Sequence, residues 1–120
     1  MKLPNGENAV VDIAKLRDYC LNADHPEGKH KARAFREKLD IGRADAEELR
    51  QAILKAILKK EAVEQLPTFY GRRFVVDFEV SRSEGEGLLM NTVMIRTAWM
   101  IRNDEDFPRL TTCFTPRRSA

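Results

Sequence analysis

The sequence predicts an α+β domain in which three N-terminal helices pack on one face of a C-terminal antiparallel β-meander of three or four strands. Two observations support this prediction. Apolar residues recur every three or four positions up to about residue 60, as in amphipathic helices. After Pro67 apolar and polar residues alternate with a period of two, which is typical of half-buried strands joined by short loops.

Length and composition favour one soluble domain. A chain of 120 residues is expected to form a single domain over 1–120, ordered from about 9 to 115, with a flexible tail over 116–120. Charged residues make up 33% of the chain, which argues against a membrane protein. No apolar run approaches the roughly 20 residues that span a bilayer, and the polar start is unlike a signal peptide. We therefore expect a cytoplasmic protein with no membrane partner.

The first helix is expected to begin after Asp12, whose carboxylate is suited to cap a helix that runs to about Leu21. Residues 9–11 could form a short edge strand before it. The apolar positions within this helix have the spacing of one buried face: Ile13, Leu16 and Cys20.

A second, basic helix is expected from Lys29 to about Asp40, following a turn through Pro26 and Gly28. Gly42 is expected to break it. At 100° per residue one side of this helix is apolar, with Ala32, Phe35 and Leu39. The opposite side is polar, with Lys29, His30, Arg33 and Glu37.

The third helix is expected to follow a capping box formed by Asp45 and Glu48, and to run to about Lys60. Its apolar stripe is the clearest in the chain: Leu49, Ala52, Ile53, Ala56 and Ile57.

The strands are expected over residues 74–80, 93–101 and 110–115, with connections at 81–87 and 103–106. Alternation places one set of large apolar side chains on a common face toward the helices: Phe74, Phe78, Ile95, Trp99, Leu110 and Phe114.

The basic helix is the first candidate functional surface. Lys29 and Arg33 lie near a helix N-terminus, where the helix dipole and backbone amides favour a phosphate. His30 lies among these cations and could transfer a proton, because its side chain titrates near neutral pH. The alternative is a solvated helix face. His25, across a proline turn, is interpreted as an exposed loop histidine without a fixed relation to His30.

The second face of the meander is the other candidate surface. Five polar residues are expected to point there: Asp77, Glu79, Arg96, Arg109 and Thr111. Cross-strand ion pairs on a solvated face would explain them. Arg96, however, has apolar neighbours along its strand, so it needs an anion. Either a carboxylate such as Asp77 or a ligand phosphate could supply it.

Several familiar kinds of site are not indicated. Cys20 and Cys113 do not form a metal-binding CxxC or a disulfide framework, and we expect two buried free thiols. The sequence has no GxSxG, no P-loop and no GxGxxG after a strand. The two histidines and scattered carboxylates have no recognisable metal-ligand spacing. We therefore predict no metal site and no cofactor.

Several stretches together resemble a bacterial domain family of unknown function, over about residues 9–115. They are Lys15–Asn22, His25-Pro26 followed by Gly28–Ala32, Phe35, Tyr70-Gly71, Trp99–Ile101 and Pro108–Thr112. This family occurs as free-standing small proteins and as C-terminal modules of toxin-like proteins, a position that implies a nuclease or similar effector. At the level of architecture the chain is also similar to small ribonuclease toxins of the RelE, barnase and colicin group.

Two functional hypotheses follow. The first is a metal-independent ribonuclease or RNA-binding effector, with His30 as acid or base and with Lys29, Arg33, Arg96, Arg109 and Thr111 binding substrate. A cognate small inhibitor protein would be its partner. The alternative is a non-catalytic interaction module, either an immunity or antitoxin-like protein or a homodimer. In that case Met94, Ala98 and Met100 would lie in a protein interface.

Overall fold

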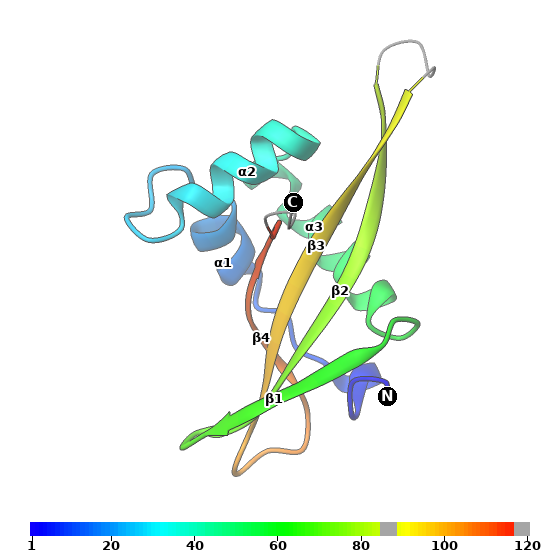
Figure 1. The fold of residues 1–120 in the computed structure, drawn as a ribbon. Helices are drawn as coiled ribbons and strands as arrows, with labels where there is room; N and C mark the ends of the chain where they lie inside the picture. The colour runs from blue at the N-terminus through cyan, green and yellow to red at the C-terminus, as the bar shows by residue number, and fades with distance from the viewer. Residues whose placement is uncertain (85–88, 117–120) are drawn as a thin grey trace.

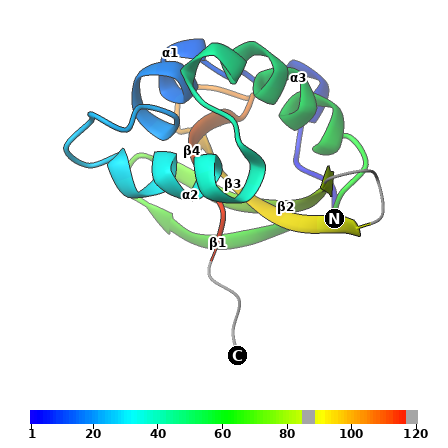
Figure 2. The same ribbon diagram turned by 90° about the horizontal axis from the view of Figure 1, so that it is seen from above.

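The computed structural model describes residues 1–84 and 89–116. Its helices lie on one side of a four-stranded antiparallel sheet, with the strands in the order β1-β2-β3-β4 (Figure 1). Figure 2 shows the helical layer above the sheet, whose other face carries no helix from the described residues. The α+β prediction, with helices first and strands second, is confirmed. The predicted tail at 117–120 lies outside the described residues.

The first helix is a composite of two short pieces. Asp12 caps α1 (Ile13–Lys15) by accepting the amide of Ala14 at 3.0 Å, as predicted. The chain then continues as a π-helical turn, η2 (Leu16–Cys20). Three helices are therefore counted only if α1 and η2 are joined. The short 3₁₀ turn η1 (Gly6–Asn8) precedes them, and Val10 forms a single parallel bridge to Arg109 in place of an edge strand.

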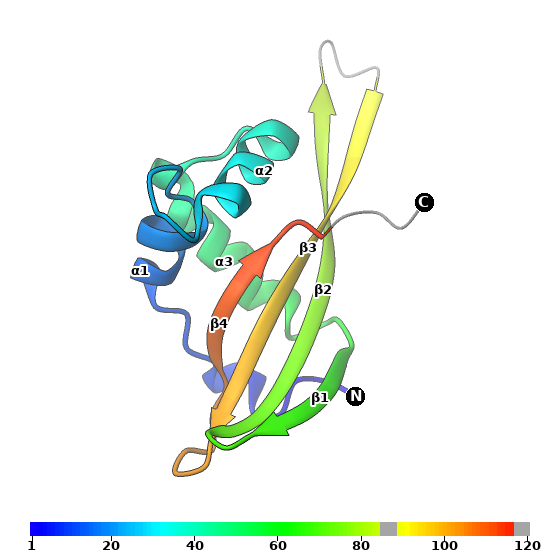
Figure 3. The ribbon, with the colours of Figure 1, turned by 60° about the vertical axis from the view of Figure 1, so that its left-hand side comes forward.

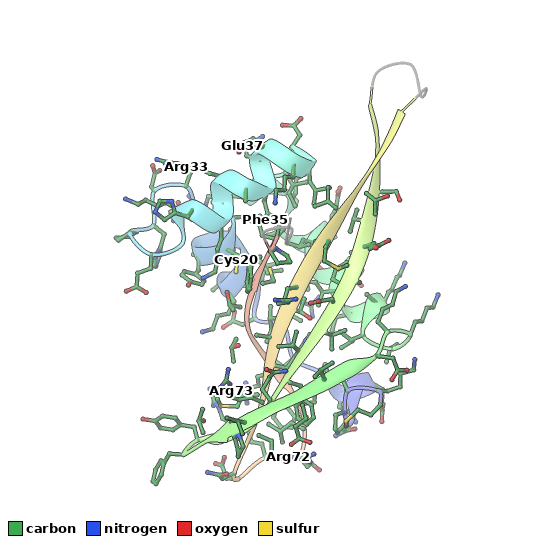
Figure 4. The ribbon with its side chains drawn as sticks, viewed as in Figure 1. Cys20, Arg33, Phe35, Glu37, Arg72 and Arg73 are labelled. Atoms are coloured by element: carbon green, nitrogen blue, oxygen red, sulfur yellow. The ribbon has the colours of Figure 1, made fainter. Side chains whose placement is uncertain are left out.

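Helix α2 (Lys29–Leu39) has the two faces that its sequence predicts. Phe35 is fully buried, and Figure 4 shows it toward the sheet, with Arg33 and Glu37 on the outer side of the helix. The helix ends because Asp40 adopts the left-handed conformation, with φ of 54°. Gly42, the predicted breaker, is extended instead.

Helix α3 (Ala46–Ala56) follows the 3₁₀ turn η3 (Arg43–Asp45). The predicted capping box is wrong, because the first turn begins three residues earlier than expected. Asp45 accepts the amide of Gly42 at 2.8 Å and does not cap α3. Both α2 and α3 have 11 residues, and no helix in the described ranges is long and apolar enough to cross a membrane.

The sheet consists of β1 (Ala62–Thr68), β2 (Gly71–Glu84), β3 (Leu89–Arg102) and β4 (Arg109–Phe114), which lie next to one another beside the helices in Figure 3. Strand β1 was not located in the sequence, because it is an edge strand with only one buried residue and contains Pro67. Strands β2 and β3 extend beyond the predicted ends, so the predicted connection narrows to residues 85–88, which lie outside the described residues.

A β-bulge in β4 changes which side chains are buried. Leu110 is opposite Trp99, but Thr112 is opposite Ala98, so Thr111 is the extra residue. Cys113 is therefore buried on the helix side, and Phe114 lies opposite Arg96 on the open side. The prediction that Phe114 points to the helices is wrong for this reason. The rest of that predicted set is buried as expected: Phe74, Phe78, Ile95, Trp99 and Leu110.

The core contains one polar chain of hydrogen bonds. The indole N–H of Trp99 donates to the hydroxyl of Thr97 at 2.8 Å, and this hydroxyl donates to the carbonyl of Val76 at 2.7 Å. Both side chains are at most 1% exposed. A buried N–H group without an acceptor lowers the stability of the folded state. The need for an acceptor of the Trp99 N–H therefore explains why a threonine occupies this position in the apolar core.

Replacing Thr97 with valine should therefore destabilise the domain by about 1–3 kcal/mol, because the Trp99 N–H loses its acceptor while side-chain volume is kept. Chemical denaturation followed by tryptophan fluorescence measures this change. The exposed Thr92, on the same strand, provides the control substitution to valine. Equal midpoints for the two variants would contradict the role of this hydrogen-bond chain.

Candidate functional site

The loop before α2 is held by the side chain of His25. Its Nδ1 accepts the backbone amides of Glu27 at 3.0 Å and Gly28 at 2.9 Å. Its carbonyl accepts the amide of Lys29, the first residue of α2, at 3.0 Å. The interpretation of His25 as an exposed loop residue without a fixed relation to His30 is therefore wrong, since it is half-buried and bonded to the start of the same helix.

These hydrogen bonds decide where the imidazole proton lies. Two amide N–H groups point at Nδ1 of His25, so the neutral ring carries its proton on Nε2. The ring edge meets the Tyr19 ring, with 4.9 Å between centroids and an interplanar angle of 80°. In this state His25 is a hydrogen-bond donor through Nε2 and is not available as a general base.

Gly28 allows the loop to pack closely on η2. A Cβ atom at this position would collide with the backbone carbonyl oxygen of Tyr19. Glycine is therefore required by close approach of two backbone segments. As a result, the His25 loop and the first turn of α2 are placed directly against Tyr19.

Lys31 connects this loop to the open face of the sheet. Its ammonium donates to the hydroxyl of Tyr19 at 2.8 Å and lies 4.8 Å from the centroid of the same ring. It lies 6.0 Å from the centroid of Phe114, the cross-strand neighbour of Arg96. The hydrogen bond to Tyr19 and the contacts with the two rings hold Lys31 at the boundary between α2 and β4.

The start of α2 carries uncompensated positive charge. Its first turn has no acidic residue, and no ion pair joins Lys29, Lys31 or Arg33 to a carboxylate within the described part of the chain. His30 beside them is exposed. Elsewhere carboxylates accompany many arginines: Arg17, Arg36, Arg43, Arg50, Arg72, Arg96, Arg102 and Arg109.

A surface groove of about 500 Å³ lies beside the His25 loop. It is lined by Asp12, Ala14, Lys15, Asp18, Tyr19, His25, Glu27 and Thr111. Hydrogen bonds from Arg17 and Arg43 lower the pKa of Asp18 to about 2, so this carboxylate stays charged and compensated. In the residues that the structure describes, no three His, Cys, Asp or Glu side chains are grouped as metal ligands.

The predicted site residues occupy three separate places. Lys29, His30 and Arg33 are together on α2. Arg96 lies on the open sheet face, where Nε and Nη2 donate to the two carboxylate oxygens of Asp77 at 2.9 and 3.0 Å. This ion pair raises the pKa of Arg96, and a carboxylate is therefore the anion that accompanies it.

The last two predicted residues lie on β4. Arg109 donates to both carboxylate oxygens of Glu105, at 2.8 and 2.7 Å, and its guanidinium lies 4.9 Å from the centroid of Phe107. Thr111, the bulge residue, donates to the carbonyl of Ala98 at 3.1 Å and lines the groove beside His25. The bulge places Thr111 at the sheet edge rather than on the open face with Asp77.

Sequence reasoning did not identify the cluster formed by Tyr19, His25, Lys31 and Phe114. Two signals were available in the sequence. His25 precedes a glycine by three residues at a helix start, a position from which a side-chain acceptor can reach free amides. Tyr19 lies in a helix whose apolar stripe it does not share. Phe114 could not be included, because its orientation depends on the bulge.

Comparison with known proteins places the chain in a protein family. The sequence matches, over residues 2–117, a family described as "Domain of unknown function (DUF6883)". No curated protein and no solved structure matches it. The predicted membership of a domain family of unknown function is therefore confirmed. The toxin-like context of that family stays a prediction.

Proposed function

The chain belongs to the family described as a domain of unknown function (DUF6883), and we propose that it binds RNA at the start of helix α2 and cleaves it without a metal ion. The observation that carries this proposal is the group of cations without carboxylate partners. Lys29, Lys31 and Arg33 lie within two turns at the positive end of a helix dipole. Such a surface attracts a phosphate backbone, whose binding releases counterions.

The aromatic rings beside these cations support a single-stranded partner. Tyr19 and Phe114 are half-buried, and their ring centroids lie 4.8 and 6.0 Å from the Lys31 ammonium. Unstacked bases bind to exposed parts of aromatic rings while cations hold the phosphates, a combination used by proteins that bind single strands. The groove beside His25 and Thr111 offers a place for one nucleotide, with the Nε2–H of His25 as a donor.

His30 is the proposed acid or base, because its exposed ring is free of the bonds that occupy His25. It takes the proton of a ribose 2′-OH, the 2′ oxygen attacks phosphorus, and the bond to the 5′ oxygen breaks as that oxygen takes a proton from the protonated His30 or from water. The products are a 2′,3′-cyclic phosphate and a 5′-OH. Lys29 and Arg33 stabilise the charge on the phosphorane. Arg96 and Arg109 can bind an RNA phosphate only by releasing their carboxylate partners, Asp77 and Glu105.

The double substitution Lys29→Glu with Arg33→Glu tests RNA binding. RNA affinity should fall, and the slope of log affinity against log salt should decrease in magnitude by about 0.7 for each lost phosphate contact. Fluorescence anisotropy with a labelled single-stranded RNA, over a salt series, measures both quantities. Folding should be retained, since Arg33 is exposed, Lys29 is only half-buried and neither belongs to the core.

A matched control carries the same charge change on another surface. Lys55→Glu with Lys60→Glu alters two exposed lysines at and after the end of α3. This variant should bind RNA much more like the wild type than the α2 variant does. Equal losses in the two variants would show only a general charge effect, and the proposed site would be wrong.

A second candidate function, a protein-interaction module, is favoured by a different observation. Apolar side chains are exposed along β1 and the turn into β2: Leu66 is 83%, Phe69 90% and Tyr70 71% exposed. Exposed apolar patches commonly mark interaction surfaces. A toxin bound by an immunity or antitoxin-like module, or a second copy of the chain, would fit this alternative. If the wild type shows no salt-dependent RNA binding at low ionic strength, the interaction module replaces the RNA-binding proposal.

A further inference from the structure

The two cysteines lie beside each other although they are distant in sequence. Cys20 ends the π-helical turn η2, Cys113 is in β4, and both are free and fully buried. The sulfur of Cys20 lies 3.8 Å from the hydroxyl oxygen of Thr112, the residue before Cys113. Figure 4 shows Cys20 between the first helix and the sheet edge. The bulge in β4 creates this proximity, because it turns Cys113 toward the helices.

Several donors converge on the sulfur of Cys20. The hydroxyl of Thr112 lies 3.8 Å from it, and the side chain and backbone of Cys113 also interact with it. With the charge of Lys31, these groups lower the pKa of Cys20, whereas donating to Cys20 and burial raise the pKa of Cys113. Cys20 is therefore the thiol that ionises first, and a neutral thiol lies next to it. Attack by a thiolate with a second thiol at hand is the arrangement from which disulfides form.

We propose that Cys20 and Cys113 are a redox modification site, which forms a reversible disulfide when the folded protein meets a peroxide. The Cys20 thiolate attacks one peroxide oxygen, the O–O bond breaks, and a sulfenic acid and hydroxide form. The Cys113 sulfur then attacks the Cys20 sulfur, the S–O bond breaks, and water leaves. The two sulfurs lose two electrons in total, and the peroxide is reduced to two waters once hydroxide takes up a proton.

Burial of the pair determines which oxidants reach it. Both sulfurs are fully buried, so an oxidant enters only when η2 opens locally. A hydrogen peroxide molecule requires a much smaller opening than an aromatic disulfide reagent. Folding should therefore slow the reaction with the bulky reagent, relative to the unfolded chain, more than it slows the reaction with peroxide.

The disulfide would also act on the proposed RNA site. Cys20 directly follows Tyr19 and Cys113 directly precedes Phe114, and these two rings are the ones in contact with the Lys31 ammonium. A covalent bond beneath them restricts the spacing of the rings. This consequence rests on the proposed function, whereas the disulfide itself does not.

The experiment exposes the folded wild-type protein to hydrogen peroxide, removes the peroxide with catalase, and then unfolds and alkylates the chain. The expected result is a monomer that has lost two hydrogen atoms, takes up no alkylating reagent, and yields a peptide linking Cys20 to Cys113. Dithiothreitol should restore two alkylatable thiols. In Cys113→Ser, peroxide should leave Cys20 as an oxidised acid or as a disulfide between two chains.

Two results would overturn the proposal: both thiols of the wild type remain alkylatable after peroxide treatment, or the oxidised protein contains only bonds between chains. Circular dichroism of the treated protein confirms that it was folded, so the result does not depend on the stability of a variant. RNA binding is measured separately on the reduced and oxidised forms. A disulfide without RNA binding in either form would retain the redox site and reject the proposed function.

Discussion

Replacing Ile53 with aspartate is expected to unfold the domain at neutral pH. Ile53 lies in α3, is 0% exposed and belongs to the single core cluster. The substitution removes apolar contacts and places a carboxylate where no cation can reach it. The cost is several kcal/mol, a large part of the roughly 5–15 kcal/mol that stabilises a domain of this size. Circular dichroism should show loss of the cooperative thermal transition.

Two control substitutions in α3 separate the effect of burying a charge from the effects of adding a surface carboxylate and of removing apolar volume. Gln51→Asp adds the same carboxylate at an exposed position of α3; because it replaces a hydrogen bond to Glu47 with a like charge one turn away, it should cost up to about 1 kcal/mol, far less than the buried charge. Ile53→Val removes one methylene from the core and should cost about 0.5–1.5 kcal/mol. An unchanged melting temperature for Ile53→Asp would show that the α3 stripe does not form the core.

Replacing His30 with alanine is expected to abolish RNA cleavage. Removal of a general acid or base typically reduces the rate by about 10²–10⁴-fold. Stability should change by no more than about 0.5 kcal/mol, because His30 is exposed. The assay uses purified proteins on total bacterial RNA, and cleavage by the wild type should persist in excess EDTA. The 5′ fragments should end in a cyclic phosphate.

The other histidine of the chain, His25, is not a suitable control for this experiment. His25→Ala removes the acceptor of two amides and should itself destabilise the domain by about 1–3 kcal/mol. Glu37→Ala, at an exposed position of the same helix, is the better control. Equal activity of the wild type and His30→Ala would reject the assignment of the acid or base. Absence of activity in every sample would favour the interaction module.

Periodicity determined most of the architecture. The apolar stripe of α3 and the alternation in β2 and β3 identified buried residues such as Ile53, Phe78 and Trp99. These patterns are reliable because burial of a helix face or a strand face repeats with the geometry of the backbone. Strand β1 has no such pattern, because an exposed edge strand buries few side chains and its sequence therefore needs no alternation of apolar and polar residues.

The sequence by itself determined the fold class, the core of the three helices, and the concentration of cations at the start of α2. Tertiary structure decided which side chains meet. A single bulge at Thr111 turned Cys113 inward and Phe114 outward, because each residue added to a strand reverses the faces that follow it. Local contacts with η2 placed His25 and Lys31 against Tyr19, and a cross-strand carboxylate paired with Arg96. These contacts depend on how η2 packs against α2 and on the pairing of β2 with β3, which residue spacing alone does not determine.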